Sequence, residues 1–373
     1  MSHPSVDVIA GARPNFMKVA PILRAARAPG SPFSTRLVHT GQHYDADMSD
    51  VFFAQLGIPR PDVHLGVGSG SHGAQTARVL AAYEELLLAS RPDGVVVVGD
   101  VNSTLACTIA AVKLGIPVVH VEAGLRSFDR TMPEELNRLM TDAAADVLHT
   151  SEPSGDANLA REGIAAERVT RVGNVMIDTL VHERPRADAA SPLPSLGLSP
   201  GGYGLVTLHR PSNVDDPDRL AALGALLARL AARLPLVFAV HPRTRGKLVA
   251  AGLWDSLSGR PGLRLLPPQG YHESLALMAG ARLVLTDSGG IQEETTFLGI
   301  PCLTLRTTTE RPITCELGTN TLVGDDLDRV EPLVADILAG RGRPGAPVPL
   351  WDGHAADRVV ADLGRRWFGA GGE

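Results

Sequence analysis

Short runs of valine, leucine and isoleucine alternate along the chain with longer segments whose apolar residues recur at helical spacing. Runs such as VDVIAG at 6–11 and GVVVV at 94–98 are typical of buried parallel strands. The segments at 72–90, 102–115 and 215–234 predict amphipathic helices. Because strand and helix alternate, the pattern predicts an α/β fold built from βαβ units, with doubly wound parallel sheets. The predicted strands lie within 6–11, 34–41, 93–100, 116–124, 146–151, 168–174, 203–210, 234–242, 263–269, 282–290 and 300–306.

A stretch rich in proline and glycine at 181–204 interrupts this alternation, as a connection between domains would. We place the domain boundary near residue 175. The prediction is a Rossmann-like N-terminal domain over 1–175, a second Rossmann-like domain over 176–353 and a C-terminal helix within 354–373. A length of 373 residues with 44% hydrophobic content is sufficient for two such cores.

Composition narrows the class of protein further. The formal net charge is −6 and no block of like charges occurs, so neither a nucleic-acid partner nor a membrane partner is expected. The cysteines at 107, 302 and 315 lack disulfide or zinc-site spacing, so we expect no metal site. The first residues do not resemble a signal peptide, and no apolar run approaches the roughly 20 residues of a membrane span. We therefore expect a soluble cytoplasmic protein.

Polar clusters follow nearly every predicted strand, for example GARPNFMK at 11–18, GDVNST at 99–104 and DSGGIQEE at 287–294. The carboxyl ends of parallel strands form the ligand crevice of such sheets. We therefore expect clusters from both domains to face one cleft.

The DSGG segment at 287–290 has the features of a phosphate site. Gly289 and Gly290 allow backbone N–H groups to approach a phosphate, and the following helix adds positive partial charge. The alternative is a plain strand-to-helix turn. Glu294, one helical turn later, is expected to accept hydrogen bonds from ribose hydroxyls, whereas Glu293 is expected to cap the helix or face solvent. Because no GxGxxG pattern is present, a tightly held dinucleotide is poorly supported.

Cationic residues also occur at strand ends in both halves: Arg13, Lys18, His209, Arg210 and Arg311. Guanidinium groups pair with phosphates through two hydrogen bonds, so this spread fits a nucleoside diphosphate gripped between two domains. For any single member, a solvated surface position is the alternative.

Acidic residues gather in the N-terminal half. Asp100 and Glu122 each follow a buried run, and Glu134 lies with Arg138 in MPEELNR. Several carboxylates at one cleft are suited to proton transfer, a task that a pure phosphate-binding module does not have. The alternatives are an N-cap role for Asp100 and a favourable first-turn position for Glu134.

Taken together, these motifs resemble the non-hydrolysing UDP-N-acetylglucosamine 2-epimerase family, relatives of the GT-B glycosyltransferases. The resemblance covers nearly the whole chain, through GARPNFMKVAP, GQHYD, GDVNSTLA, HVEAGLRS, MPEELNR, GNVMIDTL, HRPSN, DSGGIQEE and TTERP. It implies two Rossmann-like domains with the active site between them, and a C-terminal helix that packs back on the first domain. It also implies a homodimer and a UDP-sugar substrate, with no redox cofactor.

The resemblance further implies roles for individual residues. The implied reaction is reversible epimerisation at C-2, in which UDP leaves to give a bound glycal and then adds back. The implied catalytic residues are Asp100, Glu122, Glu134 and His209. The implied substrate contacts are Arg13, Lys18, Arg138, His241, Gln269, Ser288, Gly289, Gly290, Glu294 and Arg311. A regulatory site for a second UDP-sugar would involve Gln42 and His43.

Two positions depart from the family pattern. Asn15 stands where the family's GTRPE motif has an acid, and Tyr44 stands where many bacterial members have an arginine of the regulatory site. The second departure argues against activation by substrate. The alternative functions are epimerisation of a related UDP-sugar such as a UDP-2,3-diacetamido uronic acid, a hydrolysing 2-epimerase, a GT-B glycosyltransferase and a sugar-nucleotide sensor. The pathway served, cell-wall polymer or capsule among others, does not follow from the sequence.

Overall fold

A computed structural model describes residues 3–41, 53 and 55–369, with the side chains of residues 13 and 14 excepted. The chain forms two compact units, one comprising residues 1–182 and 349–373 and the other residues 183–348. The division falls inside helix α7 (Val175–Ala189), a few residues beyond the boundary expected near 175. Pro185 lies within this helix, so the first part of the proline-rich stretch is helical and not an open connection.

Unit 1 contains a fully parallel sheet in the order β3-β2-β1-β4-β5-β6-β7 within its described residues. Near-continuous β-branched runs form the central strands, because both faces of a doubly wound sheet are buried. The strands are β1 (Ser5–Ala10), β2 (Ser34–His39), β3 (Val63–His64), β4 (Gly94–Val98), β5 (Val118–Ala123), β6 (Val147–Thr150) and β7 (Val169–Arg171).

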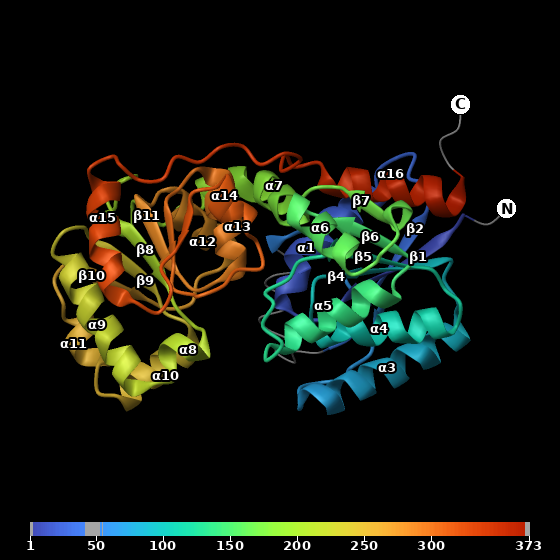
Figure 1. Cartoon of the computed structure of the whole chain (residues 1–373). Coiled ribbons are helices and arrows are strands. Elements are labelled where there is room, and N and C mark those ends of the chain that lie inside the picture. Colours follow the sequence, from blue (N-terminus) through green and yellow to red (C-terminus); the bar gives the residue numbers. More distant parts are fainter. Residues whose placement is uncertain (1–2, 42–52, 54, 370–373) are drawn as a thin grey trace. The chain divides into compact units, whose positions relative to one another are not determined.

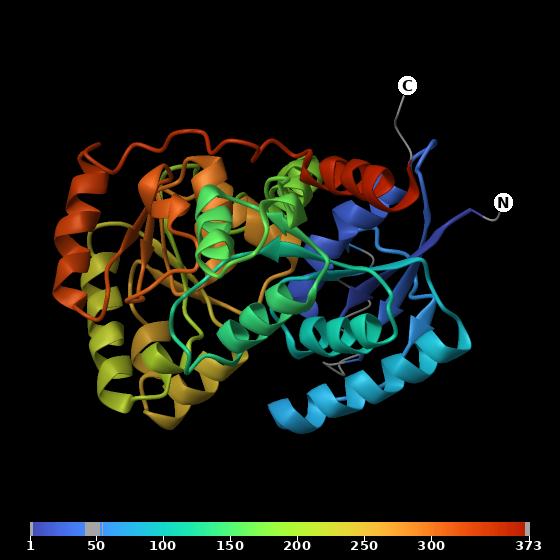
Figure 2. The same ribbon diagram turned by 45° about the vertical axis from the view of Figure 1, so that its right-hand side comes forward.

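Helices cover both faces of this sheet (Figure 1, Figure 2). On one side α4 packs against both α3 and α5, whereas on the other side α16 packs against α1. Besides α7, the helices are α1 (Arg13–Ala26), α3 (His72–Ala89), α4 (Asn102–Lys113), α5 (Pro133–Ala144), α6 (Pro153–Arg161), the 3₁₀ turn η1 (Ala166–Arg168) and α16 (Ala355–Phe368). Strand order reverses between β1 and β4, which makes their carboxyl ends the ligand position of the fold.

Unit 2 repeats the plan with a parallel sheet in the order β10-β9-β8-β11-β12-β13. Its strands are β8 (Gly204–Thr207), β9 (Leu236–Ala239), β10 (Leu263–Leu266), β11 (Leu283–Thr286), β12 (Cys302–Thr304) and β13 (Asn320–Leu322). Its helices are α8 (Pro211–Val214), α9 (Pro217–Ala231), α10 (Pro242–Ala250), α11 (Trp254–Ser258), α12 (Tyr271–Ala279), α13 (Gly289–Leu298), α14 (Ile313–Glu316), η2 (Leu327–Arg329) and α15 (Val330–Leu338). A leucine-rich core joins α9 to the sheet, and strand order reverses between β8 and β11.

The doubly wound α/β class predicted from the pattern is therefore confirmed, as are the predicted strands. Within the described residues, two strands were not predicted, β3 and β13. Both lie at a sheet edge and contain only two and three residues, too few for a periodic signal. Among the described residues, no helix combines the length and apolar character needed to cross a membrane.

Candidate functional site

In unit 1, the candidate residues lie at the carboxyl ends of β1, β4 and β5. Arg13 is the first residue of α1, directly after β1; its side chain lies outside the described part of the structure. Lys18 lies five residues further along α1, and its ammonium forms a buried ion pair with Glu122 at the end of β5. Two predicted site residues separated by 104 positions are thus brought into direct contact.

Glu122 is held in an unusual backbone conformation. Its φ of 74° lies in the left-handed region that non-glycine residues avoid, and the register between β5 and β6 shifts at this point. Such a bulge redirects a side chain, and strain of this kind concentrates at functional sites. Gly99 beside it has a φ of 70°, which would strain any other residue, and a Cβ there would lie 3.1 Å from the Lys18 Nζ and 3.2 Å from the Glu122 Oε2.

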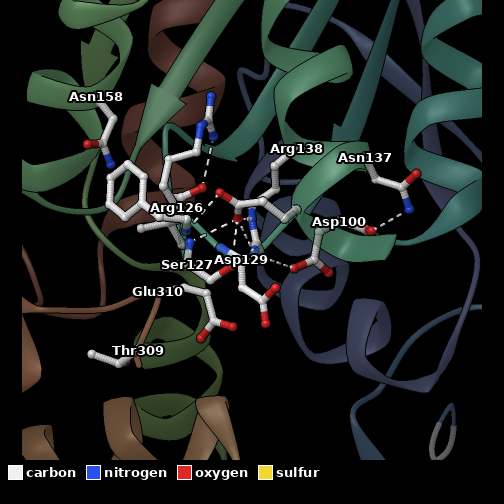
Figure 3. A network of polar contacts seen from close by, with 12 residues as sticks. Asp100, Arg126, Ser127, Asp129, Asn137, Arg138, Asn158, Thr309 and Glu310 are labelled. Atoms are coloured by element: carbon white, nitrogen blue, oxygen red, sulfur yellow. Dashed lines mark hydrogen bonds and ion pairs between the residues drawn. The ribbon is translucent and has the colours of Figure 1, made fainter. Parts of the chain in front are cut away.

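Asp100 follows β4 and contacts a different cation (Figure 3). Arg138 of α5 donates through Nη1 to Asp100, and through Nη2 to Glu135 at 2.8 Å. The Asp100 side chain retains 28% exposure. The N-cap alternative for Asp100 is wrong: α4 begins at Asn102 with Val101 as its N-cap, and no side chain caps it. Asp100 is therefore a partly exposed acid that is paired with a buried guanidinium.

Glu134 occupies the first turn of α5 and is half-buried. The acid beside it, Glu135, was not predicted, yet it has the more extensive contacts. Glu135 accepts from the Ser127 N–H at 2.8 Å and from the Phe128 N–H at 3.0 Å, in addition to Arg138. Burial opposes its charge, but these donors lower the pKa of Glu135 below its usual range. A signal for it existed, because residues three apart on a helix share a face.

The structure explains Asn15, the departure from the family pattern. Its side-chain oxygen accepts from the Ala12 N–H at 3.2 Å, and its side-chain NH₂ donates to the Val98 carbonyl at 2.9 Å. Asn15 thereby ties the β1 to α1 turn to the end of β4. A carboxylate at this position could accept the first hydrogen bond but could not donate the second.

In unit 2, His209 follows β8, and its ring contacts a carboxylate that was not predicted as a site residue. The His209 Nδ1 lies 3.0 Å from Asp287 Oδ1, and Asp287 is fully buried after β11. Asp287 also accepts from the backbone N–H groups of His209 and Arg210 and from the Asn213 side chain. Burial opposes the charge, but these bonds lower the pKa of Asp287. The carboxylate therefore fixes the His209 ring and its tautomer, as in hydrolase triads.

Two further predicted residues lie near the carboxyl end of the same sheet. His241 is the N-cap of α10, where its Nδ1 accepts from the Arg243 N–H at 3.2 Å, and its ring centroid lies 5.5 Å from that of His209. Gln269 follows β10 and donates to the Pro267 carbonyl at 2.7 Å. The predicted regulatory residues, Gln42 and His43, lie outside the described residues, as does Tyr44.

Helix α13 begins at Gly289, so Gly289 and Gly290 are its first two residues and Ser288 is the N-cap. The sequence suggested that the two glycines form a loop before the helix. In the structure both glycines belong to the helix itself. The first N–H groups of a helix have no partner within the helix, so this end is suited to an anion. A Cβ on Gly289 would meet its nearest atoms at 4.0 Å, which leaves space over the helix end.

Two buried ion pairs flank this end of α13. Arg311 pairs with Glu293 through Nε and Oε1 at 2.5 Å, and Arg306 pairs with Glu310 at 2.8 Å. The expectation that Glu293 caps the helix or faces solvent is wrong, since it is only 1% exposed. Its charge balances that of Arg311.

Glu294 is also buried, and it accepts a hydrogen bond from the Tyr271 hydroxyl at 3.0 Å. Burial, with the nearby charge of Glu293, raises the pKa of Glu294 to about 7, against the hydrogen bond from Tyr271. The carboxyl therefore changes protonation near neutral pH, and donors from a ligand would favour its ionised form.

Two doubly wound parallel units, each with acids or cations at the reversal of its strand order, form the two-lobed GT-B-like fold. The model of the UDP-N-acetylglucosamine 2-epimerase family matches residues 26–364. The chain belongs to this family.

Individual relatives agree with this assignment. The UDP-N-acetylglucosamine 2-epimerase of Methanocaldococcus jannaschii is 39% identical, over 96% of this chain and 98% of the relative. A crystal structure of that enzyme in complex with UDP-GlcNAc and UDP superimposes with a TM-score of 0.87, covering 96% of this chain and 99% of the other. A UDP-2,3-diacetamido-2,3-dideoxy-D-glucuronate 2-epimerase of Pseudomonas aeruginosa is 43% identical, over 86% of this chain and 89% of the relative.

Proposed function

We propose that the protein interconverts UDP-N-acetylglucosamine and UDP-N-acetylmannosamine by elimination and re-addition of UDP. The observation that carries the mechanism is the pair of acids at the ends of β4 and β5, each held by its own cation. One acid removes the C-2 proton while the bond between C-1 and oxygen breaks with its electron pair toward UDP. The electrons of the former C–H bond form the double bond of a glycal. Protonation of C-2 on the other face, with attack of UDP on C-1, completes the exchange without a redox cofactor.

The remaining candidate residues have complementary roles in this proposal. The C-2 proton becomes acidic only as UDP departs, so cationic and N–H groups must stabilise the developing diphosphate charge. We assign this role to His209, oriented by Asp287, and to Arg13, Arg311 and the first N–H groups of α13 after Ser288. Glu294 is the acceptor for the ribose hydroxyls, Glu134 takes part in proton transfer with Asp100 and Glu122, and His241 and Gln269 contact the substrate.

A second substrate class has specific support. The P. aeruginosa relative that acts, by its name, on a UDP-diacetamido uronic acid is 43% identical to this chain. The reaction would be the same, because the proton at C-2 and the leaving group at C-1 are common to both sugars. Only the groups around C-3 and C-6 differ.

The test is to incubate the purified protein with UDP-N-acetylglucosamine in heavy water and follow the proton NMR spectrum. We expect the two epimers to equilibrate with solvent deuterium at C-2 and only traces of UDP. Epimerisation without solvent label would contradict elimination. Accumulation of UDP with free N-acetylmannosamine would indicate a hydrolysing enzyme. Slow release of UDP without deuterium exchange at C-2 would indicate a transferase. If neither exchange nor epimer forms, the UDP-diacetamido uronic acid is tested in the same way. Deuterium at C-2 of that sugar would transfer the proposal to it. No deuterium in either sugar would indicate a sugar-nucleotide sensor.

We further propose a cytoplasmic homodimer. The family resemblance supports the dimer, and the free thiols of Cys107, Cys302 and Cys315 suit a reducing compartment. Light scattering that returns one chain mass would contradict the dimer, and recovery of the activity in another cell fraction would contradict the location.

We also propose that a second UDP-N-acetylglucosamine is not needed for activity, since Tyr44 replaces the arginine of the Gln42 and His43 motif. Plots of rate against substrate should then be hyperbolic, and UDP-N-acetylmannosamine should react alone. A lag that added UDP-N-acetylglucosamine removes would overturn this.

A further inference from the structure

Arg311 is held through both of its backbone polar groups by threonine side chains. Its N–H donates to the Thr309 Oγ1 at 3.1 Å, and the Thr314 hydroxyl donates to its carbonyl at 2.8 Å. Thr314 is fully buried in α14, and Arg311 is only 7% exposed. The backbone of this candidate diphosphate contact is therefore fixed from both sides in the loop that follows β12.

The two threonines are bonded in turn to a pair of buried amides. The Thr309 hydroxyl donates to the Gln292 Oε1 at 2.7 Å. The Asn320 Nδ2 donates to the same Gln292 oxygen at 3.0 Å and to the Thr314 Oγ1 at 3.1 Å. Gln292 and Asn320 are completely buried. Five hydrogen bonds thus form a closed ring through Gln292, Thr309, Arg311, Thr314 and Asn320.

Bonds outside the ring fix the orientation of both amides. The Gln292 Nε2 donates to the Ser288 carbonyl at 3.2 Å, which leaves Oε1 for the ring. The Asn320 Oδ1 accepts from the Thr304 hydroxyl at 2.6 Å, which leaves Nδ2 for the ring. Each group therefore acts in the role that its chemistry allows. Because the members of a buried network support one another, opening one bond weakens the hold on Arg311.

The ring also joins Arg311 to the beginning of α13. Gln292 lies in the first turn of this helix, and the next residue, Glu293, forms the ion pair with the Arg311 side chain. A Cβ on Gly289, the first residue of α13, would lie 4.0 Å from the Arg311 Nη1. Neighbouring residues of one helical turn therefore hold both the backbone and the side chain of Arg311 close to the helix end.

We propose that Gln292 and Asn320 are positioning residues that hold Arg311 in register with the first N–H groups of α13. Both amides are fully buried, so they act through Arg311 and not by contact with a ligand. The inference rests on the proposed function in taking Arg311 and the helix end as the grip on the UDP diphosphate. A grip that is formed before binding avoids the cost of ordering a loop when the ligand arrives.

Two variants of Thr309 form the first test, measured as UDP affinity by calorimetry. Thr309→Val keeps the shape of the side chain but loses the hydroxyl, whereas Thr309→Ser keeps the hydroxyl. We expect Thr309→Val to weaken UDP binding about tenfold and Thr309→Ser to stay within about twofold of wild type, the scale of one hydrogen bond. Equal UDP affinities of the two variants would overturn the proposal.

Thr319→Val is the matched control for the loss of a hydroxyl. Thr319 is also buried in unit 2, and its hydroxyl donates to the Ile300 carbonyl at 2.6 Å, at the amino end of β12 and away from the ring. Thr319→Val should bind UDP as wild type does. A loss of UDP affinity equal to that of Thr309→Val would show that the effect is one of general stability, and would overturn the positioning role.

Gln292→Met opens the ring from the other side. Methionine has nearly the length of glutamine and is a good helix former, but it cannot accept the hydrogen bond from Thr309. We expect a loss of UDP affinity similar to that of Thr309→Val. The double variant should bind no more weakly than either single one, because both remove the same bond; a combined loss of about a hundredfold would mean independent effects and would overturn the proposal.

Hydrogen exchange of the Arg311 amide, measured by NMR, tests the ring without any ligand. Exchange should be at least about tenfold faster in Thr309→Val and Gln292→Met than in wild type and Thr309→Ser, because the N–H loses its fixed acceptor. Unchanged exchange in Gln292→Met would overturn the proposal. If wild-type protein does not bind UDP, the proposed function fails, whereas this measurement still decides whether the amides hold Arg311. If Gln292→Met does not fold, the two Thr309 variants provide the same comparison.

Discussion

Asp100 and Glu122 contact cations of different kinds. The guanidinium of Arg138 is planar and donates to Asp100 and Glu135 through two different nitrogens, whereas the ammonium of Lys18 is a compact charge paired with Glu122. The two acids therefore have unequal partners, a guanidinium shared with a second carboxylate and a single ammonium nitrogen. This asymmetry suits a reaction that removes a proton on one face of a sugar and returns it on the other.

Replacing either acid by its amide should abolish most turnover while leaving substrate affinity within about threefold. Asp100→Asn and Glu122→Gln keep the shape of the side chain but cannot accept a proton, a loss that typically costs about 10²–10⁴ in rate. The measurement is kcat, with UDP affinity from calorimetry. Asp146→Asn is the control, since Asp146 accepts from the Val118 N–H at the opposite end of β5. Near wild-type turnover in Asp100→Asn or Glu122→Gln would remove that residue from the catalytic set.

Glu294 should make stability depend on pH in the acid-to-neutral range. Its pKa is raised from 4.5 to about 7 by burial, so the folded state holds a proton that the unfolded state releases. This proton stabilises the folded state by about a few kcal/mol below pH 4.5, and the stabilisation is lost as the pH rises through 7. Urea unfolding of Glu294→Gln should lack this decline, whereas Glu331→Gln on α15 should retain it. If the free energy of unfolding depends on pH in the same way in wild type and in Glu294→Gln, the carboxyl of Glu294 does not titrate while buried.

The residues of the site were partly predictable from sequence, but their contacts were not. Asp100, Glu122 and Lys18 were predicted as site residues because they are charged residues that follow strands. The carboxyl ends of parallel strands meet at one edge of the sheet. The pairing of Lys18 with Glu122 depends on how β1 and β5 are placed in the sheet, which no local pattern encodes.

Helix α13 is the element whose start differs most from its prediction. The pattern IQEETTFLG indicated a helix after the glycines, yet the helix includes both of them. Glycine disfavours helix interiors, which is why the pattern was read as a turn. The two ends of the helix are marked by Ser288, the N-cap, and by Gly299, which has a left-handed φ of 70°. These two residues define the helix more clearly than its first residues do. Edge strands β3 and β13 were missed for a different reason, their shortness.

Gly289→Ala separates helix stability from phosphate binding. The new methyl group would meet nothing closer than 4.0 Å, and alanine is the better helix former, so the free energy of unfolding should be unchanged or higher by up to about 1 kcal/mol. UDP affinity should fall at least tenfold, because the methyl group lies where a phosphate approaches the N–H groups. Gly246→Ala in α10, where the space around the glycine is also open, is the control and should bind UDP normally. Unchanged UDP affinity in Gly289→Ala would place the diphosphate elsewhere.

At the scale of the whole molecule, the last helix belongs to the first unit. Asp178 of α7 accepts from the N–H groups of Ala355 and Ala356, the first residues of α16. The ring of Trp367 lies against Gly94, where a Cβ would come within 2.4 Å of it. Unit 1 is thus completed by a segment that follows all of unit 2 in the sequence.

Truncation of the buried Leu363 should destabilise unit 1. Leu363 is fully buried in α16, and Leu→Ala at such a site costs about 2–5 kcal/mol. Urea unfolding monitored by fluorescence reports on it, since Trp351 and Trp367 lie in unit 1. Asp357→Ala on the exposed face of α16 is the control, with an expected change within about 0.5 kcal/mol. Equal stability of Leu363→Ala and this control would mean that the helix adds nothing to the core of unit 1.

Because residues 349–373 return to unit 1, the order in which a ribosome makes the chain differs from the order in which the units can be finished. Residues 183–348 are contiguous, so this unit has its whole sequence as soon as it leaves the exit tunnel. Residues 1–182 appear first, yet the face of α1 that receives α16 stays uncovered until the second unit has been synthesised. The nascent protein therefore exposes apolar surface on its older half for the time needed to translate its younger half, and this is the interval in which a chaperone or a protease would meet it.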